Sequence, residues 1–211
     1  MPGWESMWAG GLRPGQAFDA ARVEPALAKL CAGGSLPPRG RALVPGCGRG
    51  YAVAELARAG FDATGLEIAP TAVKAANDHI SASEQLGDAA WRVIAGDFFE
   101  HRVAETERYS LIYDCTFLCA IEARQREAWA QQMAALVQPG GECITLIFPV
   151  QDPPYAGGPP FCMSVELVRS LLLPAGFEEK SVIEVATADL ARASVKSGAK
   201  EFLGRWTRIS K

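Results

Sequence analysis

The sequence predicts an α/β fold: a mostly parallel sheet of seven strands with helices on both faces and an antiparallel pair closing one edge. First, short apolar runs alternate along the chain with segments of helical periodicity, which is typical of βα units. Second, the run Glu142–Val150 (ECITLIFPV) is almost continuously apolar, as expected for a strand buried on both faces. Third, the last two predicted strands follow each other without a long helix between them, so we expect them to pair antiparallel.

The elements follow in chain order. The predicted strands are Arg41–Pro45, Asp62–Ile68, Trp91–Ala95, Tyr109–Tyr113, Glu142–Val150, Glu178–Val185 and Glu201–Ile209. The predicted helices are Tyr51–Ala59, Pro70–Ile80, Glu122–Val137 and Ser164–Leu173. Gly60 ends the first helix and Pro70 opens the second, both common roles at helix ends. The Pro- and Gly-rich stretch Gln151–Phe161 predicts a long loop.

Composition limits the function classes. A chain of 211 residues with 49% hydrophobic and 21% charged residues predicts one globular domain over residues 1–211. The net charge of −3 and the lack of a basic run argue against nucleic acid as a partner. No apolar run approaches the ~20 residues of a membrane span. The cysteines lack C-x-x-C spacing and the first residues lack a signal-peptide pattern, so we expect a cytoplasmic protein with reduced cysteines, acting as a monomer.

A glycine turn, Val44-Pro45-Gly46-Cys47-Gly48-Arg49-Gly50, joins the first strand to the first helix. Glycines there permit positive φ and let a ligand approach the backbone. The next strand brings Glu67, whose carboxylate can accept hydrogen bonds from both ribose hydroxyls of an adenosine. These features leave three interpretations open: an adenosyl-sulfonium cofactor, a dinucleotide, or a purely structural turn.

Two details favour the adenosyl-sulfonium. The turn is G-x-G-x-G rather than the dinucleotide pattern G-x-G-x-x-G, and Arg49 at the helix start could meet the carboxylate of an amino-acid tail. Asp97 follows the third strand with Phe98 beside it, so the pair could bind an adenine amino group and cover its ring. The alternative for Asp97 is a helix N-cap.

The fourth strand ends at Asp114, beside the point where ligands bind in open α/β sheets. We expect Asp114 and the carbonyls after it to face the cationic end of the ligand, although Asp114 could also cap the next turn. The loop after the fifth strand leaves the same edge, and Tyr155 and Phe161 are candidates to line the acceptor pocket. The alternative for that loop is a solvated connector.

The N-terminal segment, residues 1–30, is a candidate cover for the site. Trp4 and Trp8 lie one helical turn apart, and Phe18-Asp19 follows them. Such a segment could fold over the ligand and exclude water. The alternative is an ordinary amphipathic helix packed on the domain.

These motifs together resemble the thiopurine S-methyltransferase-like family, and most of all its thiol/halide methyltransferase branch, which includes the plant "harmless to ozone layer" enzymes. The resemblance covers nearly the whole chain in order and spacing. The similar stretches are Trp4-x-x-x-Trp8, Phe18–Pro25, Ala42–Tyr51, Gly65–Ala76, Gly96–Glu100, Leu111–Glu122, Trp129–Val150, Gly157–Phe161 and Lys200–Trp206.

The resemblance implies a class I methyltransferase fold, a Rossmann-like three-layer sandwich, with S-adenosylmethionine as cofactor. It implies a small soft nucleophile as methyl acceptor: a thiol, hydrosulfide, thiocyanate, halide or metalloid species. The cofactor-binding residues that it implies are Trp4, Trp8, Phe18, Gly46, Gly48, Glu67, Ile68, Asp97, Phe98, Asp114 and Cys115. The branch usually has Trp where this chain has Phe18 and Tyr where it has Cys115, so the acceptor stays open.

A sulfonium methyl group needs mainly a nucleophile held in line with it, which is worth ~7–11 kcal/mol. His79 and His101, the only histidines, are not placed to act as a base at the methyl end, and we expect no metal site. Candidate acceptor-pocket residues are Tyr51, Thr116 and Tyr155, with Asp19 nearby. Three alternatives remain: an N- or O-methyltransferase of a small metabolite, an NAD-binding oxidoreductase, and a catalytically silent binding module.

Overall fold

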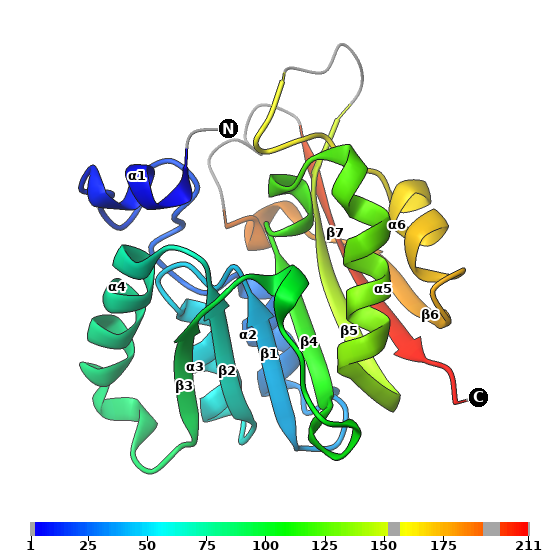
Figure 1. The fold of residues 1–211 in the computed structure, drawn as a ribbon, viewed down its shortest axis with the longest axis horizontal. Coiled ribbons are helices and arrows are strands. Elements are labelled where there is room, and N and C mark those ends of the chain that lie inside the picture. Colours follow the sequence, from blue (N-terminus) through cyan, green and yellow to red (C-terminus); the bar gives the residue numbers. More distant parts are fainter. Residues whose placement is uncertain (1–2, 152–156, 192–198, 211) are drawn as a thin grey trace.

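A single seven-stranded sheet forms the centre of the molecule, in the order β3-β2-β1-β4-β5-β7-β6 (Figure 1). The computed structural model describes residues 3–151, 157–191 and 199–210. The strands are β1 (Arg41–Pro45), β2 (Asp62–Glu67), β3 (Trp91–Ala95), β4 (Tyr109–Cys115), β5 (Val137–Val150), β6 (Phe177–Glu184) and β7 (Lys200–Arg208). Strands β1 to β5 pair in parallel, and β7 runs antiparallel between β5 and the outermost strand, β6. The predicted α/β class and the antiparallel closure of one edge are therefore confirmed.

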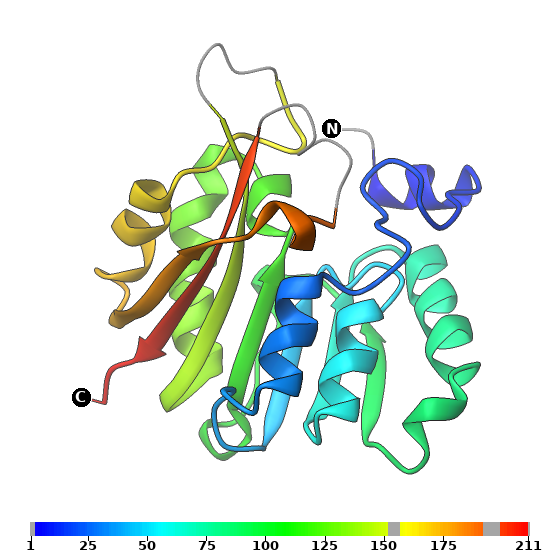
Figure 2. The same cartoon turned by 180° about the vertical axis from the view of Figure 1, so that it is seen from behind.

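Helices cover both faces of the sheet, which makes three layers. These covering helices are α2 (Pro25–Ala32), α3 (Tyr51–Arg58), α4 (Pro70–Ser81), α5 (Arg126–Leu136) and α6 (Val165–Leu172), and a further helix, α1 (Trp4–Ala9), precedes them in the chain. Helix α5 lies over β4 and β5 and α6 lies over β7 and β6 in Figure 1, and α2 and α3 cover the opposite face, seen in Figure 2. Short 3₁₀ turns cover Glu84–Leu86, Phe98–Glu100, Glu105–Glu107, Leu118–Ala120, Ala123–Gln125 and Thr187–Asp189.

The hydrophobic core consists of one cluster on each face of the sheet. On one face, Trp129 of α5 and Trp206 of β7 are completely buried. On the other, Leu27 of α2 and Val53 of α3 are completely buried against β1 and β4. Strand β4 is buried along its whole length. Burial on both faces is what a near-continuous apolar run predicts for a strand in the middle of a sheet.

Two boundaries differ from the sequence prediction by more than two residues, the starts of α5 and β5. The predicted helix Glu122–Val137 is a 3₁₀ turn followed by α5, which ends at Leu136. Strand β5 begins at Val137 because that residue pairs with Tyr109 of β4 before the register shifts. Helix α2 was not predicted as a separate element, since only eight residues carry its pattern, behind a proline at its first turn.

Helix α1 stands apart from these layers, above the N-terminal end of α4 at the carboxyl edge of the sheet (Figure 1). The side chain of Glu5 on α1 accepts a hydrogen bond from the backbone amide of Thr71 at 3.0 Å and also bonds the Thr71 hydroxyl. The N-cap residue of α4, Ala69, makes no side-chain cap, so Glu5 satisfies an amide that would otherwise lack a partner. The N-terminal segment is therefore anchored at the edge where ligands of open α/β sheets bind.

Candidate active site

The glycine turn lies at the carboxyl end of β1 and has the backbone conformation that its glycines permit. Gly46 and Gly48 have φ values of 56° and 52°. A Cβ on Gly46 would come within 2.6 Å of the Phe117 ring, so a larger residue there would also collide with the turn after β4. The turn after β1 and the turn after β4 therefore lie against each other.

Glu67 at the end of β2 is bonded to the glycine turn. Its Oε2 accepts from the amide of Gly48 at 3.0 Å, and its Oε1 accepts from the amides of Ile68 at 2.8 Å and Ala69 at 3.1 Å. Burial raises the pKa of this carboxyl group, although the three amides act in the opposite direction. A carboxylate has about four acceptor positions, so three amides leave room for a ligand hydroxyl. The side chain of Ile68, beside it, is 53% exposed.

Asp97 follows β3 and caps the short turn after it. Its Oδ1 accepts from the amide of Phe99 at 2.8 Å, so the capping alternative is correct for this oxygen. The Phe98 ring is only 3% exposed and packs edge-on against Phe99 and Phe117, with centroids 5.5 and 5.0 Å away. The expectation that this ring covers an adenine does not agree with its position in the core. A contact from Phe98 would have to come from its backbone.

Asp114 at the end of β4 points into the core. Its Oδ2 accepts from Trp129 Nε1 at 2.8 Å, and its Oδ1 accepts from the amides of Phe117 and Leu118 at 3.3 and 3.2 Å. Complete burial raises its pKa to about 6, because these hydrogen bonds only partly offset the desolvation of the charge. The alternative that this carboxylate caps the next turn is therefore correct, and its role toward the cationic end of a ligand stays a prediction.

The turn after β4 consists of neutral residues that follow Asp114. Cys115 is 9% exposed, and the half-buried Thr116 has a φ of 63°, a left-handed conformation that is strained for a β-branched residue. The Thr116 hydroxyl donates to the Cys115 carbonyl at 2.6 Å. Tyr155, the third candidate from the sequence, lies outside the described residues, whereas Phe161 belongs to the margin of the core on the α5 side.

Three aromatic side chains of the N-terminal segment gather beside the glycine turn. Phe18 packs edge-on against Trp4 and Trp8, with centroids 5.7 and 6.0 Å away. Trp8 is 4% exposed, and one ring carbon lies 3.6 Å from the position of a Cβ on Gly48. The cluster rests on Ala69 and Ala72 at the start of α4. The structure thus brings Trp4, Trp8 and Phe18 together with the glycine turn.

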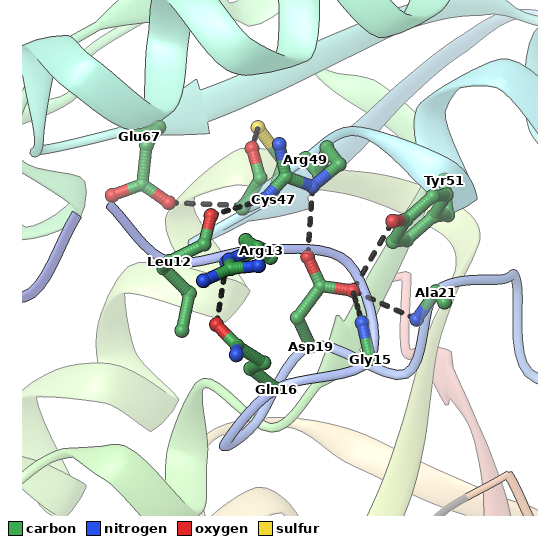
Figure 3. A network of polar contacts seen from close by, with 11 residues as sticks. Leu12, Arg13, Gly15, Gln16, Asp19, Ala21, Cys47, Arg49, Tyr51 and Glu67 are labelled. Carbon is green, nitrogen blue, oxygen red and sulfur yellow. Dashed lines mark hydrogen bonds and ion pairs between the residues drawn. The ribbon is translucent and has the colours of Figure 1, made fainter.

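Arg49 and Tyr51 are held by Asp19 of the N-terminal segment, as Figure 3 shows. Arg49 Nε donates to Asp19 Oδ2 at 2.8 Å, and the Tyr51 hydroxyl donates to Oδ1 at 3.1 Å. Burial, followed by the charge of Asp19, raises the pKa of Tyr51 to about 12. The expectation that Arg49 meets a ligand carboxylate does not agree with this pairing. Sequence reasoning selected Asp19 as a polar residue but gave no signal for its partners.

Neither histidine lies at the end of β4. His79 of α4 packs edge-on against Tyr51 with centroids 4.8 Å apart, and His101 Nε2 is 2.9 Å from the Tyr109 hydroxyl. Burial lowers the pKa of both, so both are neutral at pH 7. Within residues 3–151, 157–191 and 199–210, no three side chains of the metal-binding types are grouped to hold an ion. The same ranges contain no helix long and apolar enough to cross a membrane.

The chain is similar to known methyltransferases in sequence and in fold. The family model described as thiopurine S-methyltransferase matches residues 1–210. The chain is 40% identical to a probable thiol methyltransferase 2 and 38% identical to a thiocyanate methyltransferase 1, both of Arabidopsis thaliana, over 99% of this chain and 85% of each relative. Among solved structures, magnesium protoporphyrin IX methyltransferase of Synechocystis with bound S-adenosylhomocysteine is similar in fold, with a TM-score of 0.67 at 18% identity, covering 87% of this chain and 80% of that one.

Proposed function

The chain belongs to the thiopurine S-methyltransferase family, and we propose that it transfers the methyl group of S-adenosylmethionine to a small, soft, anionic sulfur nucleophile. Family membership makes it an S-adenosylmethionine-dependent S-methyltransferase, so the dinucleotide and binding-module alternatives fall away. The proposal concerns the acceptor, which we take to be a thiolate, hydrosulfide or thiocyanate. The names of the two plant relatives support this class.

The residues at the ends of β1 and β2 suit an adenosyl cofactor. Glu67 keeps a buried carboxylate with acceptor capacity left for a ribose hydroxyl, and Ile68 exposes an apolar side chain beside it. Gly46 and Gly48 lack the side chains that would keep a methionine moiety from the backbone. When bound, S-adenosylmethionine supplies an electrophilic methyl group on a sulfonium centre. We assign adenine to Asp97 and the backbone of Phe98, and the methionine end to the backbone of Asp114 and Cys115.

The observation that carries the acceptor proposal is the turn after β4. The one acid of that turn, Asp114, faces the core; Cys115 is buried as well, and the half-buried neutral residues Thr116 and Phe117 follow it at the strand end. Neutral side chains such as that of Thr116 can orient a nucleophile but cannot deprotonate it. An acceptor that is already anionic, or ionises readily, needs no base. A free thiol with a pKa near ~8.5 is a few per cent thiolate at neutral pH.

The part of the protein in this reaction is therefore positioning and exclusion of water. Orientation of the reacting groups can account for ~7–11 kcal/mol of the barrier. We assign the acceptor pocket to Tyr51, Thr116 and Tyr155. Residues 1–30 supply its cover, with Trp4, Trp8 and Phe18 as the aromatic wall. The clustering of these three rings at Gly48 supports that assignment.

Three finer points belong to the same proposal. Halide ions and metalloid species would be accepted as well, because they share the softness and charge of the sulfur acceptors. The enzyme would act in the cytoplasm as a monomer. No nucleic acid or membrane would take part, in keeping with the net charge of −3.

An acceptor panel tests the proposal. The purified chain is incubated with S-adenosylmethionine and thiocyanate, hydrosulfide, an aryl thiol, iodide or selenite, and volatile methylated products are measured by gas chromatography. We expect turnover with the sulfur anions. An amine and a phenol serve as controls: faster turnover with either would favour the N- or O-methyltransferase alternative. Absence of turnover with every sulfur acceptor would overturn the proposal.

A further inference from the structure

Asp19 is a buried charge that the proposed reaction does not use. Its side chain is 2% exposed, and its ion pair with Arg49 is buried as well, since Arg49 is 13% exposed. Besides Arg49 and Tyr51, it accepts from the backbone amides of Ala21 at 2.7 Å and Gly15 at 3.4 Å. One carboxylate therefore joins the N-terminal segment, the glycine turn and the first turn of α3 (Figure 3).

Arg49 extends this connection to the aromatic cluster. Its Nη2 donates to the Leu12 carbonyl at 2.9 Å, and its guanidinium carbon lies 5.2 Å from the centre of the Trp8 ring. Trp8 in turn lies beside Gly48. The hydrogen bonds that the structure records for the Arg49 guanidinium thus both go to acceptors in the N-terminal segment.

The stretch from residue 10 to 22 is a strap between two anchored helices. At one end Glu5 of α1 bonds Thr71 of α4, and at the other Leu27 of α2 is completely buried in the core. Within the strap, Ala17 and Ala21 have φ values of 50° and 57°, a left-handed conformation that costs energy for residues other than glycine. Both flank Asp19, whose carboxylate bonds Ala21 within the strained path and Arg49 outside it.

We propose that Asp19 is a positioning residue: its ion pair with Arg49 locks the strap onto the glycine turn before the cofactor arrives and so sets cofactor affinity. The proposal rests on the proposed cofactor site but not on the identity of the acceptor. A cover that is already ordered lowers the entropy lost on binding, which tightens the complex without new ligand contacts. Removing one partner leaves a buried unpaired charge, whereas removing both does not.

The test is a double-mutant cycle with Asp19→Asn, Arg49→Met and the double variant. Affinity for S-adenosylhomocysteine is measured by calorimetry, and exchange of amide hydrogens in residues 4–22 is measured without ligand. Each single variant should bind at least about tenfold more weakly and exchange faster in the strap. The double variant should be no weaker than the weaker single variant, because interacting partners are not additive. Arg49→Lys, which keeps the charge, should recover most of the affinity.

Matched controls separate this role from general stability. Asp62→Asn breaks the exposed ion pair with Arg92, far from the strap, and should leave affinity and strap exchange unchanged. Urea unfolding identifies any variant that is globally destabilised, and in that case strap exchange is compared with exchange in β4. Single variants with affinity and strap exchange within about twofold of the wild type would overturn the proposal, as would purely additive losses in the cycle.

Failure of the proposed function has a different signature. If the wild type does not bind S-adenosylhomocysteine, the cofactor site is wrong, but strap exchange still reports on the Asp19–Arg49 pair. If it binds but transfers no methyl to sulfur, only the acceptor is wrong. In kinetics, Asp19→Asn should raise the KM for S-adenosylmethionine about tenfold or more, with a much smaller change in kcat, because the pair acts on binding.

Discussion

The turns after β1 and β4 lie against each other at the same edge of the sheet, yet their carboxylates lie in opposite places: one at the edge, the other in the core. Both contain left-handed residues: glycines after β1, and Thr116 after β4. The turn after β1 directs its Gly48 amide to Glu67, a carboxylate from another strand that stays at the edge. The turn after β4 is capped by its own carboxylate, Asp114, which is directed inward to Trp129.

This difference divides the site into a polar half and a neutral half. The polar half holds acceptor groups and is closed by the buried pair of Asp19 and Arg49, which suits a charged, hydroxyl-rich cofactor. The neutral half offers the half-buried Thr116 and no ionisable side chain of its own beside the buried Cys115, which suits a nucleophile that arrives as an anion. A methyl transfer without a base requires this division, because binding of the donor and orientation of the acceptor are its only tasks.

The largest expected effect comes from removing the acid of the polar half. In Glu67→Ala, three backbone amides lose their acceptor and the ribose hydroxyls lose theirs. Hydrogen bonds to a charged group contribute ~1.5–3 kcal/mol each, so affinity for S-adenosylhomocysteine should fall about 100-fold or more in calorimetry. Glu67→Gln keeps the shape and should lose less. Wild-type affinity in Glu67→Ala would place the ribose elsewhere.

The pH dependence of the unfolding free energy tests whether Asp114, in the turn after β4, is buried as the structure shows. Because burial raises the folded-state pKa from 3.8 to about 6, the folded protein keeps a proton that the unfolded chain releases, and stability falls as the pH rises between these values. The asparagine variant lacks this dependence. At ~1.4 kcal/mol per pKa unit, the unfolding free energy of the wild type should fall by up to about 3 kcal/mol relative to Asp114→Asn. Urea unfolding across this range measures it, and parallel profiles would contradict the orientation of Asp114.

The polar half was largely predictable from sequence because it depends on backbone conformation. The glycine spacing at Gly46 and Gly48 predicts positive φ, and the alternation of strands predicts that Glu67 lies at the same edge.

The rest of the site was not predictable because it depends on side-chain packing between distant segments. The pairing of Asp19 with Arg49 joins positions 30 residues apart, and no periodicity relates them. Asp114 turns inward because Trp129, on a helix 15 residues later, offers a buried donor. Whether a carboxylate at a strand end faces ligand or core depends on such a donor, which the pattern of the strand alone does not contain.

The variant Thr116→Gly sharpens the comparison, because it places in the turn after β4 the residue type that is left-handed in the turn after β1. A left-handed residue other than glycine costs ~1–2 kcal/mol, so Thr116→Gly should leave the unfolding free energy unchanged or raise it by up to about 1 kcal/mol. Turnover with thiocyanate should fall several-fold, since the hydroxyl at the acceptor side is lost. Thr116→Ser keeps the hydroxyl and is the control. A glycine variant that is less stable, or turns over like the wild type, would contradict a strained residue retained for function.

The smallest expected effect on turnover comes from substituting the histidines. It tests whether the neutral half works without a general base. His79 lies against Tyr51 on the polar side and His101 bonds Tyr109, and burial keeps both neutral at pH 7. Loss of a general base costs ~100-fold or more, so His79→Asn and His101→Asn should each keep turnover within about tenfold. Thiocyanate is the sharper acceptor here, because it carries its charge throughout the accessible pH range and its rate should be nearly independent of pH. A histidine-dependent inflection in that profile would mean that a base acts at this site, and the turn after β4 would then no longer account for the chemistry.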